Sequence, residues 1–133
     1  MVVIMDKSIN EKEIETVNIQ LYALLFTLIS SIISIIITYN QKKELKDKKG
    51  MFTPKEIYNI TLFNRVLILV LSFIFLYVNY NLYEISKEEG EDLKPYKLQL
   101  LASILIIASG SIALYVVSLS GKESISDVEN PII

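Results

Sequence analysis

Three long apolar runs divide the chain, at residues 16–41, 66–83 and 98–121, and none of them contains Asp, Glu, Lys or Arg. Each run is close to the roughly 20 residues that a helix needs to cross the hydrocarbon core of a bilayer. A water-soluble helix of this length would instead carry charged residues at the helical period, so that one face stayed polar. The pattern predicts an all-α integral membrane protein with three transmembrane helices, at about 17–40, 62–83 and 97–119.

Capping signals predict that the first two helices extend beyond the membrane on one side. Thr53, Pro54 and Glu56 form a capping-box pattern with proline at the first helical position, about ten residues before the second apolar run. Upstream, residues 41–49 are rich in helix-forming residues and stop at Gly50, the residue type expected just past a helix end. We therefore expect a long antiparallel helical hairpin with a short cytoplasmic extension.

The remaining helix ends carry similar signals. Gly90 is expected to end the second helix, Asp92 or Lys94 to begin the third, and Gly121 to end it. There is no linker-like composition and no internal repeat, so residues 1–133 are interpreted as a single membrane domain.

Charges in the two connections predict the orientation. The connection at 41–56 is basic and the connection at 84–96 is acidic. Lys and Arg beside a transmembrane segment are retained in the cytoplasm. We therefore expect the amino terminus outside and the carboxyl terminus in the cytoplasm, with the cell membrane as the location if the protein is bacterial. Lysines near the surface also attract anionic lipids, which makes the following residues candidate headgroup contacts: Lys42, Lys43, Lys46, Lys48 and Lys49.

Arg65 is the charged residue nearest to a predicted membrane core. A long basic side chain near a helix end extends to the headgroups, so Arg65 is a further candidate lipid contact at the inner boundary. The alternative is a specific pairing with a partner's carboxylate or a lipid phosphate, with neighbouring Asn64 as a second ligand.

Small and hydroxyl residues within the spans form candidate interfaces. In the first span they recur at helical spacing along one face: Thr27, Ser30, Ser31, Ser34 and Thr38. The third span supplies a matching surface: Ala102, Ser103, Ser109, Gly110 and Ala113. Such residues either pack helices within one protomer, or line a water-filled pore, or face a partner's helix. Hydroxyls can also bond their own backbone, so they do not decide between these alternatives.

Composition gives no support for enzymatic chemistry. The chain has no cysteine and no histidine, and its four glycines stand far apart, which excludes a glycine-rich phosphate loop. The carboxylates lie outside the apolar runs, and we expect pairs such as Glu88 and Glu89 to have nothing that raises a pKa. The net charge of −2 gives no basic face for nucleic acid. We expect neither catalysis nor a cofactor or metal.

By elimination, the sequence favours an accessory subunit or membrane scaffold. Its partners are then the lipid bilayer and another membrane protein or a second copy, and the cytoplasmic hairpin extension is the docking surface. The alternative is a homo-oligomeric pore of the small phage-holin type, with the hydroxyl stripe of the first span facing the lumen. The chain resembles phage holins in length and number of spans only. A solute exporter subunit is disfavoured because no acidic residue lies within a span.

Overall fold

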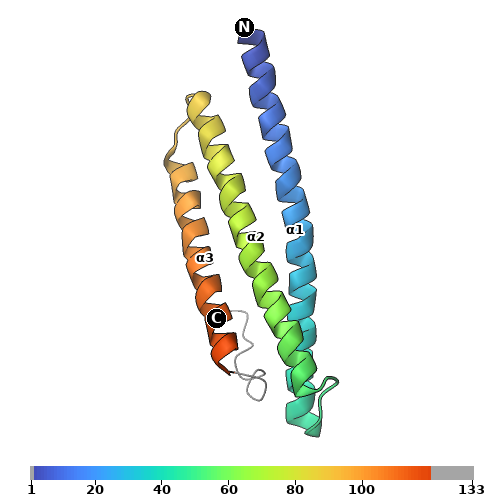
Figure 1. Ribbon diagram of the computed structural model, residues 1–133. Helices are drawn as coiled ribbons and strands as arrows, with labels where there is room; N and C mark the ends of the chain where they lie inside the picture. Colours follow the sequence, from blue (N-terminus) through green and yellow to red (C-terminus); the bar gives the residue numbers. More distant parts are fainter. Residues whose placement is uncertain (1, 121–133) are drawn as a thin grey trace.

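The computed structural model describes the backbone of residues 2–120 and the side chains of residues 9–119. Over this part of the chain the protein consists of three helices, α1 (Val2–Asp47), α2 (Pro54–Glu88) and α3 (Lys94–Ser120) (Figure 1). Each of them is long and apolar enough to cross a membrane. The prediction of an all-α protein with three helices suited to span a membrane is confirmed.

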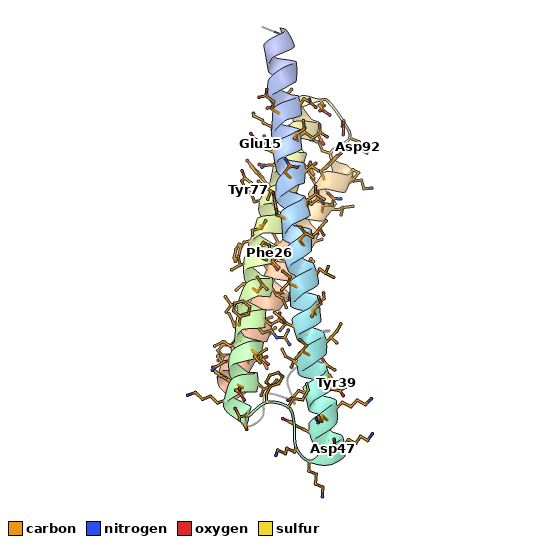
Figure 2. All side chains as sticks on the ribbon, turned by 90° about the vertical axis from the view of Figure 1, so that its right-hand side faces the viewer. Glu15, Phe26, Tyr39, Asp47, Tyr77 and Asp92 are labelled. Atoms are coloured by element: carbon orange, nitrogen blue, oxygen red, sulfur yellow. The ribbon has the colours of Figure 1, made fainter. Side chains whose placement is uncertain are left out.

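The surface of the three helices is largely apolar. In the most apolar 18-residue window of each helix, only 17%, 28% and 17% of the residues are buried. Large side chains such as Leu25, Phe63 and Ile112 are more than half exposed. Figure 2 shows charged residues near the ends, at Glu15, Asp47 and Asp92, with Phe26 in the stretch between them. Water-soluble monomers rarely expose apolar patches of this size, so these faces fit hydrocarbon as their solvent.

α2 is the central helix of the molecule. α1 and α3 each pack along α2, and within the described residues the backbones of α1 and α3 do not come close to each other (Figure 1). The stripe of the first span and the small residues of the third therefore do not pack on one another, and buried members of the two sets, such as Ser30 and Ser103, bond α2 instead. Buried residues of α2 recur at spacings of three, four and seven, the period of helices packed nearly parallel or antiparallel: Ile57, Thr61, Asn64, Leu71, Val78 and Ile85.

A hydrophobic cluster joins the helices near the connection between α1 and α2. Ile37, Ile57 and Val117, one from each helix, are at most 2% exposed. Phe52, from the connection itself, packs against this cluster. The core therefore anchors the turn to the helices.

α2 has the predicted start and end. Thr53 Oγ1 accepts a hydrogen bond from the Glu56 amide (3.1 Å), and Glu56 Oε1 accepts one from the Thr53 amide (2.9 Å). At the other end Gly90 adopts a left-handed φ of 73°, and the amide of Glu91 donates to the Ser86 carbonyl (3.0 Å), as in a Schellman motif. α3 then begins at Lys94, whose amide donates to Asp92 Oδ1 (3.2 Å).

Gly50 was expected to end the first helix, and this expectation was wrong. α1 ends at Asp47, and Lys48, not Gly50, adopts the left-handed conformation, with φ of 60°. Glycine fits position 50 because a Cβ there would lie 2.6 Å from Asn40 Oδ1 and would displace that side chain. That oxygen accepts hydrogen bonds from the amides of Met51 (2.7 Å) and Phe52 (3.2 Å), so the turn folds back over the last part of α1. Gly121, the expected end of the third helix, lies outside the described residues.

Asn40→Ala should destabilise this turn. Asn40 is fully buried, and its loss leaves two backbone amides without their acceptor, which costs about 1–3 kcal/mol. The free energy of unfolding of the purified protein, measured by titration with a denaturing detergent, should fall by this amount. Asn59→Ala, at an exposed position early in α2, is the matched control and should change little. Equal losses in the two variants would contradict the role of Asn40.

Candidate functional site

Asn64 of α2 forms hydrogen bonds to two serines of α1. Ser30 Oγ donates to Asn64 Oδ1 (2.7 Å), and Asn64 Nδ2 donates to Ser34 Oγ (2.8 Å). Asn64 is 1% exposed and Ser30 4%. Interhelical hydrogen bonds of this kind hold helices together where no hydrophobic force does. Two members of the predicted stripe therefore bond within the protomer.

Asn79 of α2 makes the corresponding bridge to α3. Its Nδ2 donates to Ser103 Oγ (2.5 Å), and the Ser103 hydroxyl donates in turn to the Gln99 carbonyl (3.0 Å). Ser103 is buried, whereas Asn79 is half-buried. α2 is thus bonded to α1 and to α3 by two separate polar bridges.

Packing by small residues continues the contact of α3 with α2. Ala113 is buried, and a Cβ on Gly110 would come within 3.5 Å of Leu69 Cδ1. Ala102 and Ser109 are exposed, so these two members of the predicted set lie away from the tightly packed surface.

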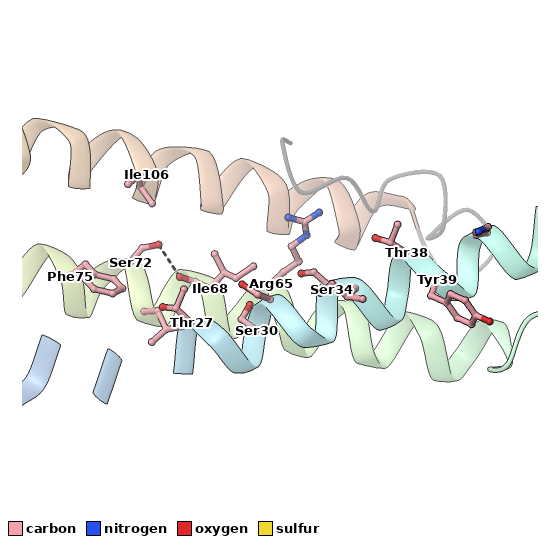
Figure 3. Close-up of a pocket in the computed structure, with 14 residues that line it drawn as sticks. Thr27, Ser30, Ser34, Thr38, Tyr39, Arg65, Ile68, Ser72, Phe75 and Ile106 are labelled. Carbon is pink, nitrogen blue, oxygen red and sulfur yellow. Dashed lines mark hydrogen bonds between the residues drawn. The ribbon is translucent and has the colours of Figure 1, made fainter. Parts of the chain in front are cut away.

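A groove of about 850 Å³ opens beside these contacts, between α1 and α3 and over α2 (Figure 3). All five stripe residues of α1 line it, together with Tyr39 and Lys42. α2 contributes one charged residue and three large apolar residues to the lining, and α3 contributes Ile106: Arg65, Ile68, Leu71 and Phe75 are those of α2.

The groove has its charged side chains toward one end and its largest apolar side chains toward the other, where Thr27 and Ser72 also lie. Figure 3 shows Arg65 reaching from α2 toward α3 near Ser34, with Thr38 further along toward the basic connection. At the opposite end lie Phe75 and Ile106. Arg65 is only 7% exposed, so its guanidinium lies between helices within the groove. Contact of Arg65 with headgroups stays a prediction.

The hydroxyls of the groove differ in their bonding. Thr27 Oγ1 donates to the carbonyl of Ala23 (2.8 Å), and Ser72 Oγ donates to that of Ile68 (2.8 Å). Both bonds stay within one helix, as hydroxyl groups in apolar helices commonly do. Ser31 and Thr38 are exposed along the groove wall.

The candidate lysines do not gather in one place. Lys42 lines the groove, and with Lys46 it also lines an adjoining depression of about 460 Å³. Lys48 and Lys49 are exposed in the turn, and Lys43 is half-buried on α1. The structure therefore brings Arg65 and Lys42 to the groove and leaves the other lysines around the end of α1.

The acidic connection contains an interacting carboxylate pair that the sequence did not predict. A hydrogen bond with Glu91 raises the pKa of Glu89, and desolvation and the charges of Glu91 and Glu13 add to this effect. The same bond, with one from Tyr96 Oη (3.0 Å), lowers the pKa of Glu91. The expectation that nothing would raise the pKa of Glu89 was wrong, because the Schellman turn brings its partner back toward it. Among the described residues no cluster of three or more potential metal ligands occurs.

The interhelical role of Asn79 and the role of Asn40 in holding the turn were missed from the sequence. Asn79 follows Asn64 by fifteen residues within an apolar stretch, and amides are costly in hydrocarbon unless they are bonded. The cost of an unbonded amide in hydrocarbon was the signal that could have indicated an interhelical role for Asn79. No protein-family model matches the chain, and comparisons with curated proteins and with solved structures find no match either.

Asn64→Ala should loosen the contact between α1 and α2. Interhelical hydrogen bonds contribute about 0.6 kcal/mol each on average in a membrane, so losing two should lower the free energy of unfolding by about 1 kcal/mol. Ser31→Ala, one residue from Ser30 but exposed, is the control and should have no effect. A Ser30→Ala, Asn64→Ala double mutant that loses the sum of both single losses would contradict the bond.

Glu91→Ala should shift the titration of Glu89 to lower pH. A raised pKa means that the Glu89 carboxyl keeps its proton to higher pH, and removal of Glu91 removes the main cause. Carboxyl carbon chemical shifts followed by NMR over a pH range measure this change. Glu88→Ala removes an adjacent charge without removing the hydrogen bond, so the pKa of Glu89 should then stay raised.

Proposed function

We propose that this chain is a non-enzymatic, multi-pass membrane protein that acts as an accessory subunit or membrane scaffold. The observation that carries the proposal is the use of the buried polar residues. Asn64 and Asn79 use their hydrogen bonds to join α2 to α1 and α3, so these side chains have a structural role. A scaffold needs this rigidity and no reactive group.

The docking surface in this proposal is the end of the α1–α2 hairpin, which we place in the cytoplasm from its lysines. Leu45 is 78% exposed and Met51 45% exposed, although both lie outside the apolar spans. Exposed apolar side chains ringed by lysines suit a partner with an apolar and acidic surface. The Asn40 bonds and the capping box fix the shape of this surface.

Crosslinking from this surface tests the proposal. The chain has no native cysteine, so Lys48→Cys offers a unique attachment point in the turn. In native membranes it should crosslink to one defined partner or to a second copy, whereas Asp92→Cys, in the other connection, should not. Leu45→Glu in the Lys48→Cys background should abolish the product, because it puts a charge on the exposed apolar contact. A crosslink pattern that is indifferent to Leu45 would refute docking at this surface.

A homo-oligomeric pore is the second candidate, and one observation favours it. Thr27, Ser31 and Thr38 lie along a continuous open groove, so copies arranged around an axis would present hydroxyls to a lumen. Against it, Ser30 and Ser34 are engaged by Asn64. The scaffold proposal expects purified protein in liposomes to retain a trapped dye. Uniform large rings, with dye leakage that Ser31→Leu abolishes, would establish the pore instead.

A further inference from the structure

We propose that residues 121–133 bind back on the end of the α1–α2 hairpin, in the depression that adjoins the groove. These residues, called here the 121–133 segment, lie outside the described part of the chain and follow directly on α3, which ends at Ser120. Binding of the segment does not depend on the proposed function. Its consequence, competition of the segment with a docking partner, rests on that function.

The depression is a surface on the last turns of α1. It measures about 460 Å³ and is lined by Thr38, Gln41, Lys42, Leu45 and Lys46. Thr38 and Lys42 also line the groove between α1 and α3, so the depression continues the groove on the same side of α1. Leu45 is 78% exposed, more than any other large hydrophobic side chain of the described residues. An exposed leucine between two lysines suits an occupant that is both apolar and anionic.

The 121–133 segment has this composition. It contains three carboxylates and one lysine, with apolar residues among them: Lys122, Glu123, Ile125, Asp127, Val128 and Glu129. Residues 41–49 contain five lysines and two carboxylates. The two stretches therefore have opposite net charge, and each carries apolar side chains next to its charges.

α3 brings the chain to the same end of the molecule as the depression. α1 and α3 run in the same direction (Figure 1), and Val117 of α3 belongs to the same hydrophobic cluster as Ile37 of α1. Ile37 precedes Leu45 by about 12 Å of helix and Val117 precedes Ser120 by about 4.5 Å, so Leu45 lies only about 8 Å further along the helix axes than Ser120. Five residues of extended chain span about 17 Å, so residues from Ile125 onward are within reach of Leu45.

A tethered segment needs little affinity to occupy this surface. Exposed ion pairs are individually weak. A short tether, however, gives an effective concentration of roughly 1 mM, so a contact too weak to hold separate molecules together is populated within one chain. An anionic lipid headgroup would neutralise the lysines and leave Leu45 in water, whereas the segment offers apolar side chains to Leu45 and carboxylates to Lys42 and Lys46.

The segment would occupy part of the surface that the proposed function assigns to a partner. A partner then has to displace the 121–133 segment before it contacts Leu45. Under that function, the segment is an autoinhibitory element of the scaffold.

Disulfide formation in the purified full-length protein tests the binding in the absence of any partner. The chain has no native cysteine, so Leu45→Cys and Ile125→Cys supply its only two thiols, in phosphatidylcholine liposomes. The rate at which they join, divided by their rate with a free uncharged thiol, gives an effective concentration and cancels differences in thiol reactivity. We expect at least about tenfold more than the roughly 1 mM of a tether alone. Asp92→Cys with Ile125→Cys, which joins opposite ends of the molecule, should give no intrachain disulfide.

Charge reversal locates the contact. Lys42→Glu with Lys46→Glu should lower the effective concentration at least about fivefold, the effect of two exposed ion pairs. Lys48→Glu with Lys49→Glu makes the same change of charge outside the depression and should leave it within about twofold. In the Lys42→Glu, Lys46→Glu background, reversal of the three carboxylates of the segment should restore the value: Glu123→Lys, Asp127→Lys and Glu129→Lys.

Several results would overturn the binding. One is an effective concentration near that of the tether alone, and another is an equal effect of the two pairs of lysine substitutions. A disulfide-linked dimer in place of the intrachain bond would show that a second copy is the occupant. Loss of the intrachain bond when phosphatidylglycerol replaces part of the phosphatidylcholine would show that lipid headgroups occupy the lysines instead.

Competition is tested separately in native membranes, through the crosslink from Lys48→Cys. Neutralising the segment should raise the yield of the partner crosslink at least about threefold, because the segment then leaves the depression more often: Glu123→Gln, Asp127→Asn and Glu129→Gln. An unchanged yield would overturn the competition alone. No crosslink from either chain would overturn the proposed function, while the disulfide result would still establish or refute the binding of the segment.

Discussion

In hydrocarbon the hydrophobic effect does not drive apolar helices together, and the rest of the structure depends on this constraint. Association must come from close packing and from polar groups that have nowhere else to bond. α2 carries such groups toward both neighbours, Asn64 toward α1 and Asn79 toward α3. They stand fifteen residues apart, about 22 Å along the helix, so each neighbour is held at a different depth. The central position of α2 is therefore a chemical consequence of where its two amides lie.

The groove follows from the same arrangement. Because α1 and α3 are each bonded to α2 and not to one another, a space is left between them over part of α2. Successive residues of a helix point about 100° apart. Asn64 can thus face α1 while Arg65, the next residue, projects into the space. A single dipeptide supplies both the bond that holds α1 and the charge beside it.

Sequence patterns located the elements much better than the contacts between them. Hydropathy and the capping signals at Thr53 and Gly90 predicted three helices and both ends of the long α2. Periodicity placed Ser30 and Ser34 on one face, but a period cannot say which helix that face meets. The role of Gly50 and the effect of Glu91 on the pKa of Glu89 depend on a chain that folds back on itself, so no local pattern contained them.

Bonding within the protomer also bears on the two ways in which the hydroxyl stripe can be used. Ser30 and Ser34 already bond Asn64, and Thr27 donates to the carbonyl of Ala23 in its own helix. A hydroxyl that is bonded within the protein gains less from contact with water in a lumen. Of the five stripe residues, Ser31 and Thr38 are the two exposed along the groove, so the stripe is used mainly for bonds within the protomer.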